Sequence, residues 1–62
     1  MNLDEKNRVI EAFHKVLLII RCDELLMEGK TRGILEGIYK TVDLKKERTR
    51  LKQSLSKYLD WL

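Results

Sequence analysis

Hydrophobic residues recur every three or four positions through the first part of the chain, which is the spacing of one face of an α-helix. The residues on this first face are Val9, Ile10, Phe13, Val16, Leu17, Ile20 and Met27, and Glu24 interrupts them. The chain contains no proline, and its first glycine is Gly29. The pattern predicts one continuous helix from Asn2 to Glu28, which Asn2 caps and Gly29 ends.

A second apolar patch lies roughly opposite the first face of the same helix. Its residues are Leu18, Ile19, Cys22, Leu25 and Leu26. A helix that is apolar all round is usually buried all round, and one antiparallel neighbour covers only one side of it. We therefore expect the second patch to contact either a third helix of the chain or a second copy.

Residues 31–62 also follow helical spacing, but in two phases. The first stripe is Ile34, Leu35, Ile38 and Val42, and the second begins at Leu44 and continues through Leu51, Leu55, Tyr58 and Leu62. Thr31 is a candidate N-cap for this part, and Asp43 is a candidate cap for a separate last helix. Two arrangements remain open, namely two long helices or a long, a short and a long helix, and the second is favoured.

Two glycines, Gly33 and Gly37, are four residues apart and would share one side of the predicted short helix. Each glycine destabilises a helix by up to about 1 kcal/mol relative to alanine, so their presence requires a reason. Close approach of another helix supplies one, because small residues let two backbones come together. We therefore include both glycines among the residues expected to contact a partner.

These elements predict an all-α protein with a single helical domain over residues 1–62. It would be a helical hairpin or a small three-helix bundle, completed by self-association, with a homodimer favoured. Sixty-two residues lie near the lower limit for a domain that folds alone. Small chains of this kind gain stability from disulfides, a metal or a partner. The single cysteine excludes an internal disulfide, which leaves a partner as the expected source.

The composition offers little chemistry. With one histidine, His14, and one cysteine, Cys22, eight positions apart, we expect no metal site, no cofactor and no enzymatic activity. A lone cysteine and an N-terminal stretch without a secretory pattern favour the cytoplasm. The longest apolar run is residues 16–20, far short of the roughly 20 residues of a membrane span.

Charge is unevenly distributed around the net value of +3. Residues 1–28 hold four basic and six acidic residues, whereas residues 29–62 hold nine basic and four acidic ones. A basic stripe is predicted along the last helix, formed by Lys46, Arg50 and Lys57 and flanked by Lys45 and Lys52. Such rows bind phosphates through counterion release. They are also a common solvated surface, and no aromatic residues are interleaved for base stacking.

Two further residues carry specific expectations. Arg48 falls among apolar positions, and a hairpin that turns at residues 29–30 would place it level with Glu11. A second copy would offer Asp23 or Glu24 instead, and the remaining alternative is a side chain that extends to water. Trp61 is expected to cover the end of the bundle, and the alternative is that it presents an anchor to a partner.

The sequence therefore favours a small protein-interaction or regulatory module that forms a homodimer and binds another protein through a helical surface. The alternative is a small basic nucleic-acid-binding protein that uses the basic stripe. No membrane association is expected.

Overall fold

The first helix, α1, runs from Leu3 to Met27 in the computed structural model, which describes residues 2–61 and the side chains up to Tyr58. The Asn2 side chain accepts a hydrogen bond from the Glu5 N–H at 2.8 Å, as the predicted N-cap requires. At the other end, Gly29 has φ of +84°, and the Lys30 N–H donates to the Leu25 carbonyl at 3.1 Å. This is the Schellman pattern, so both predicted ends are confirmed.

The segment after α1 is a short β-hairpin, so the prediction of helix over residues 31–42 is wrong. Strand β1, Arg32–Gly33, pairs antiparallel with strand β2, Val42–Asp43. The Leu44 N–H extends this pairing by donating to the Thr31 carbonyl at 3.0 Å. Thr31 is therefore part of the hairpin and does not cap a helix.

A tight turn near the tip of the hairpin explains why no helix forms there. Gly37 has φ of +84°, a left-handed conformation, and the Ile38 N–H donates to the Leu35 carbonyl at 2.9 Å. Both features are typical of a turn with glycine at its third position. Of the predicted apolar stripe, Leu35 is buried, Ile38 and Val42 are half-buried, and Ile34 is exposed.

The last helix, α2, runs from Leu44 to Trp61. The Asp43 carboxylate accepts a hydrogen bond from the Lys46 N–H at 3.0 Å, so the predicted cap before this helix is confirmed. The side chain of Trp61 lies outside the described residues, and its expected place at the end of the bundle stays a prediction.

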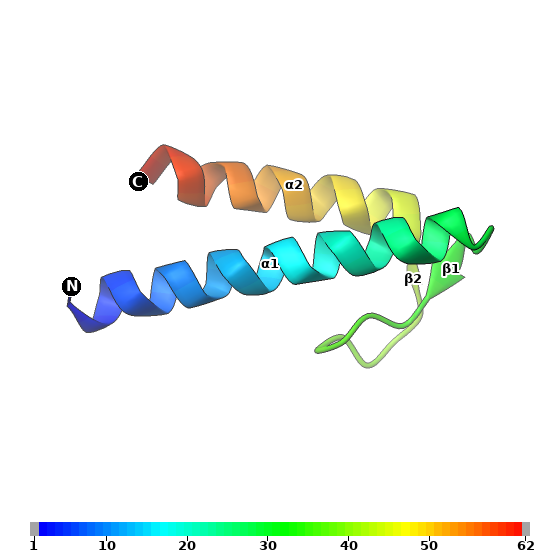
Figure 1. Cartoon of the computed structure of the whole chain (residues 1–62), viewed down its shortest axis with the longest axis horizontal. Coiled ribbons are helices and arrows are strands. Elements are labelled where there is room, and N and C mark those ends of the chain that lie inside the picture. The colour runs from blue at the N-terminus through cyan, green and yellow to red at the C-terminus, as the bar shows by residue number, and fades with distance from the viewer. Residues whose placement is uncertain (1, 62) are drawn as a thin grey trace.

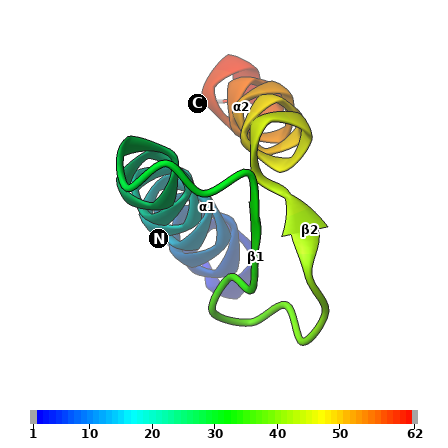
Figure 2. The ribbon, with the colours of Figure 1, turned by 90° about the vertical axis from the view of Figure 1, so that its right-hand side faces the viewer.

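The two helices lie side by side and antiparallel, and the β-hairpin projects from the end where they are joined (Figure 1). Seen along the helices, α1, α2 and the hairpin surround a common centre (Figure 2). The core sits there, and its buried residues are Leu18, Cys22, Leu25, Leu35, Leu44 and Leu51. The fold is thus a mostly helical hairpin of two helices with a two-stranded sheet in place of the favoured third helix.

Two polar contacts define the register of α1 against α2. The Arg48 guanidinium pairs with the Asp23 carboxylate, and the Tyr58 hydroxyl donates to the Glu11 carboxylate. Arg48 therefore does not lie level with Glu11, and the expectation of that pair is wrong. The β-hairpin occupies the residues that a simple turn would have given to α2, so the second helix starts later and its register is shifted.

Candidate interaction surface

The two apolar sides of α1 have opposite environments. Leu18 is 6% exposed, Cys22 and Leu25 are also buried, and Ile19 and Leu26 pack partly buried against the same core. The second apolar patch is therefore covered from within the chain, by α2 and the hairpin. This corrects the expectation that these five residues are available to a partner.

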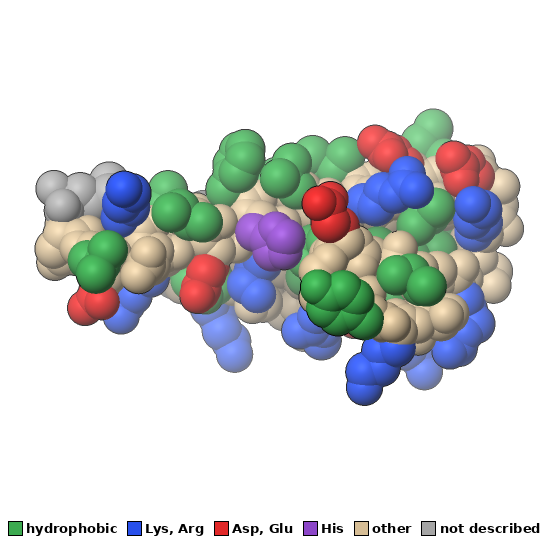
Figure 3. All heavy atoms as spheres, turned by 90° about the horizontal axis from the view of Figure 1, so that it is seen from below, with side chains coloured by type: hydrophobic (Ala, Val, Ile, Leu, Met, Phe, Trp, Pro, Cys, Tyr) green, Lys and Arg blue, Asp and Glu red, His purple; other side chains and the backbone are tan. Residues whose placement is uncertain are grey.

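The exposed side of α1 holds Leu3 and all of the first face except the half-buried Val16, and we call it the outer face of α1. Phe13 is 64% exposed, and the other large exposed apolar residues of this face are Leu3, Val9, Ile10, Leu17, Ile20 and Met27. In a view from below, hydrophobic side chains follow the edge formed by α1, while basic side chains gather along the opposite edge (Figure 3). Among the described side chains, neither α2 nor the hairpin covers the outer face.

Charged side chains occur at two places on the outer face. Lys6 lies near its beginning and Glu24 near its end, and both are exposed. The Glu24 carboxylate pairs with Arg21 on the same helix, with 3.1 Å between the guanidinium Nη1 and Oε2. Both side chains are about half exposed, so this ion pair stabilises the helix only weakly.

The two glycines lie in the hairpin, so they share no helix face. A Cβ at Gly33 would lie 3.4 Å from Leu25 Cδ1, which shows that β1 packs closely on α1 within the chain. A Cβ at Gly37 would lie 3.3 Å from His14 Nε2. The close approach that these glycines allow is therefore between the hairpin and side chains of α1 in the same chain, and their contact with a partner stays a prediction.

A hollow between α1 and the hairpin tip opens onto the outer face. It is lined by His14, Leu17, Leu18, Ile20, Arg21, Glu24 and Glu36. Apolar side chains and opposite charges thus meet at one border of the outer face, where the hairpin would flank any helix that packs on it.

The predicted basic stripe is divided between separate places on α2. Lys45, Lys46 and Arg50 line one depression together with Thr49 and Gln53. Arg50 is held by Glu47, with its Nε 3.0 Å from Oε1. Lys52 is exposed and lines neither this depression nor the one around Lys57.

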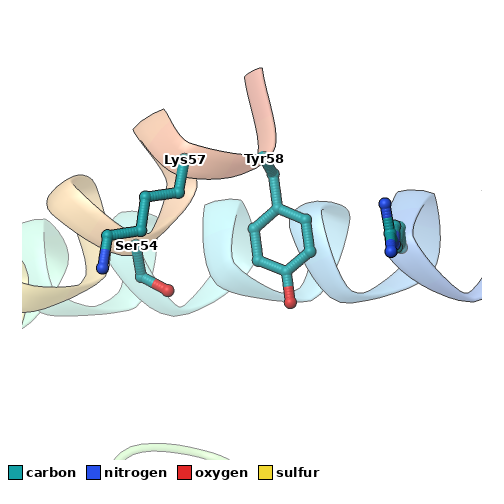
Figure 4. Close-up of a pocket in the computed structure, with 4 residues that line it drawn as sticks. Ser54, Lys57 and Tyr58 are labelled. Atoms are coloured by element: carbon teal, nitrogen blue, oxygen red, sulfur yellow. The ribbon is translucent and has the colours of Figure 1, made fainter. Parts of the chain in front are cut away.

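Lys57 lies near the far end of α2, beside Ser54 and Tyr58. These three side chains and Arg8 line a shallow pocket between the free ends of the two helices, and Tyr58 extends from α2 towards α1 (Figure 4). The Lys15 ammonium lies 5.8 Å from the centre of the Tyr58 ring, within the range of a cation–π contact. Tyr58 therefore joins α2 to the N-terminal half of α1.

Two acidic groups of the fold have raised pKa values. The hydrogen bond to Glu11 is the main cause that raises the pKa of the Tyr58 hydroxyl above its ordinary value of 10.0. Burial is the main cause that raises the pKa of the Cys22 thiol above 9.0, with the carboxylates of Glu47 and Asp23 adding to it. A thiol with a raised pKa is a poor nucleophile at neutral pH, which favours a structural role for Cys22.

These shifts predict that the protein loses stability in alkaline solution. Both groups are protonated in the folded and unfolded chain below about pH 8, so their contribution is then fully present. Above that pH the unfolded chain ionises first, and the free energy of unfolding falls as pH rises through the raised values. Urea denaturation between about pH 9 and pH 11 measures this fall. The Tyr58→Phe variant is expected to show a shallower decline, and equal slopes for both proteins would contradict the role of Tyr58.

Among the described residues, no group of histidine, cysteine, aspartate and glutamate side chains is placed to hold a metal ion. Over the same part of the chain, no helix combines the length and the apolar content needed to cross a membrane.

The chain matches no protein-family profile, no curated protein and no solved structure. The outer face of α1 is the most extended candidate surface that the described residues offer.

Proposed function

We propose that this protein is a non-enzymatic interaction or regulatory module that self-associates, as a homodimer, through the outer face of α1. The observation that supports this proposal is a row of large apolar side chains that follows α1 from Leu3 to Met27 and stays exposed. Contiguous apolar patches of this kind on soluble proteins are typical of interaction sites. The single, buried cysteine favours the reducing cytoplasm as the place of action.

The energetics favour a partner on this face. Complete burial of one Leu, Ile or Phe side chain contributes roughly 1.5–3 kcal/mol. Among the described side chains, the core of the single chain holds six buried hydrophobic residues, a small number for an independent domain. Covering the outer face would bury about as many large apolar side chains again in each copy. Association is therefore expected to stabilise the fold as well as to create the functional assembly.

The test is the oligomeric state of the Phe13→Glu variant. Wild-type protein is expected to sediment as a dimer at micromolar concentrations, and Phe13→Glu is expected to weaken the dimer by at least ~100-fold. Ile34→Glu is the matched control, because Ile34 is similarly exposed but lies on the hairpin. Circular dichroism of all three proteins establishes that they are folded. A folded wild-type monomer at all concentrations would refute self-association, and so would a Phe13→Glu dimer of unchanged strength.

The alternative function, binding of nucleic acid, is supported by the depression on α2 where Lys45, Lys46 and Arg50 lie together with Gln53. These side chains would contact phosphates, and such binding weakens steeply as salt rises. A fluorescence anisotropy titration of an RNA or DNA oligonucleotide at two salt concentrations separates the two functions. Salt-sensitive binding that the Lys45→Gln/Lys46→Gln variant loses would support the alternative.

A further inference from the structure

The outer face of α1 follows a seven-residue repeat. Leu3, Lys6, Ile10, Phe13, Leu17, Ile20, Glu24 and Met27 are separated alternately by three and four positions. This is the spacing of the two core positions of a coiled coil. All eight residues are exposed in the single chain. These eight residues, which we call the seam, therefore have the pattern of a coiled-coil core without a partner helix, and they extend over the whole of α1.

The seam matches itself when a second copy of α1 is placed antiparallel. With Phe13 opposite Leu17 of the second copy, Ile10 faces Ile20, and Leu3 faces Met27. In the same register Lys6 faces Glu24. Each of these pairs joins one kind of core position to the other, as antiparallel coiled coils do. Every apolar residue of the seam thus faces an apolar residue, and each charge faces the opposite charge.

The two-fold symmetry of a homodimer repeats each of these pairs. Four apolar layers would form the middle of the interface. Two of them pair Ile10 with Ile20, and two pair Phe13 with Leu17. A Lys6–Glu24 pair would flank the middle on each side, and Leu3 with Met27 would form the outermost layers. Arg21 already pairs with Glu24 in the single chain, and a carboxylate accepts from two cations, so that contact is compatible with the interface.

Other arrangements of the same two helices are less favourable. A parallel pair in register would place Lys6 beside Lys6 and Glu24 beside Glu24, so like charges would repel at both ends. An antiparallel pair shifted by one heptad would place Lys6 opposite Leu17, or Glu24 opposite Phe13. A charge would then face an apolar residue in the seam, and the overlap would be shorter. Charged residues in a coiled-coil seam select register and orientation in this way.

The distribution of burial along α1 independently favours this partner. The buried residues of α1 are Leu18, Cys22 and Leu25, all in its C-terminal half. Among the described side chains, the N-terminal half contributes contacts such as Glu11 with Tyr58 but no buried residue. Helices are stabilised mainly by packing of an apolar face. The antiparallel arrangement would place the N-terminal half of each copy against the C-terminal half of the other.

We infer that the partner of the outer face is a second copy of this chain, whose α1 packs antiparallel as a coiled coil with Lys6 opposite Glu24 and Phe13 opposite Leu17. This inference rests on the proposed function, because it specifies the orientation and register of that self-association. The helix has 25 residues, so the interface is roughly 37 Å long.

Charge reversal tests the register. Lys6→Glu and Glu24→Lys are each expected to weaken the dimer by about tenfold, because each change turns two attractive pairs into repulsive ones. The double variant Lys6→Glu/Glu24→Lys restores opposite charges in the antiparallel register and is expected to recover wild-type affinity. In a parallel dimer it would leave like charges together and recover nothing. Sedimentation equilibrium measures all four proteins.

Cysteine cross-linking tests the orientation. In a Cys22→Ala background, the Leu3→Cys and Met27→Cys chains are expected to form a disulfide-linked dimer when mixed, and neither should do so alone. Positions 3 and 27 are about 36 Å apart along one helix, so a link between them must join two copies. Self-linking of the Leu3→Cys chain would show a parallel pair and overturn the inference.

The outcomes separate this inference from the proposed function. A wild-type monomer overturns both. A different result overturns only the antiparallel register and leaves the proposed function standing. In that result Phe13→Glu abolishes the wild-type dimer, but the double charge variant does not regain wild-type affinity and no disulfide forms between positions 3 and 27.

Discussion

Replacing Leu18 with glutamate is expected to unfold the protein, whereas the same replacement at the neighbouring Leu17 is expected to leave the single chain folded. Leu18 is 6% exposed and lies on the side of α1 that packs against α2 and the hairpin, while Leu17 is 49% exposed on the outer face. Burial of an unpaired carboxylate costs several kcal/mol, in addition to the lost apolar contact. A domain of this size has a total stability of about 3–9 kcal/mol, so the Leu18 change removes most or all of it.

Far-UV circular dichroism and urea denaturation at low micromolar concentration measure the difference between the two variants. Leu18→Glu is expected to lose most of its helical signal, and Leu17→Glu is expected to keep it while losing self-association. Equal unfolding of both variants would mean that α1 has no stable fold apart from a dimer. A folded Leu18→Glu variant would contradict the described core.

The ends of the helices could be predicted because their signals are local. Asn2, Gly29 and Asp43 each act within four residues of their own position, through a side-chain cap or a left-handed backbone. Such signals depend little on the rest of the fold. The confirmed predictions therefore concern where helices begin and end. The predicted register between α1 and α2 is wrong because it depends on contacts that are not local.

The β-hairpin was missed because its apolar residues also fit a helix. Ile34, Leu35, Ile38 and Val42 have helical spacing, and periodicity alone does not distinguish short segments. In the structure, the left-handed Gly37 ends any helical course, and the contact of Leu35 with the core stabilises the hairpin. Tertiary packing thus overrides a pattern that is too short to be decisive.

The two apolar sides of α1 could not be assigned from their hydrophobicity, because each offers several large apolar residues at helical spacing. Which side is buried depends on where α2 and the hairpin dock, and that depends on residues far apart in the sequence, such as Leu25 and Leu44, that share one core. A signal was nevertheless present. Lys6 and Glu24 lie between apolar residues of the outer face, whereas no charged residue interrupts the run of Leu18, Cys22 and Leu25 on the buried side. Charge within an apolar stripe indicates the side that meets water or a partner.

In the hairpin, Leu35→Ala is expected to lower the free energy of unfolding strongly, whereas Ile34→Ala is expected to change it little. Leu35 is 1% exposed and packs in the core, while its neighbour Ile34 is 62% exposed. Truncation of a buried leucine costs about 2–5 kcal/mol, through lost burial and the cavity that remains. Truncation of an exposed side chain on a loop changes stability by no more than about 0.5 kcal/mol.

The comparison of Leu35→Ala with Ile34→Ala also decides whether the hairpin belongs to the cooperative fold. If it does, Leu35→Ala lowers the free energy of unfolding of the whole chain, and the helical signal of α1 and α2 is lost at a lower urea concentration. If the hairpin were an appended loop, helix unfolding would be the same in both variants. The first outcome is expected, because Leu35 lies in one cluster with Leu18, Leu44 and Leu51 from both helices. The six buried residues of the described core include only Leu35 from the hairpin, and its loss would weaken the contact between the helices.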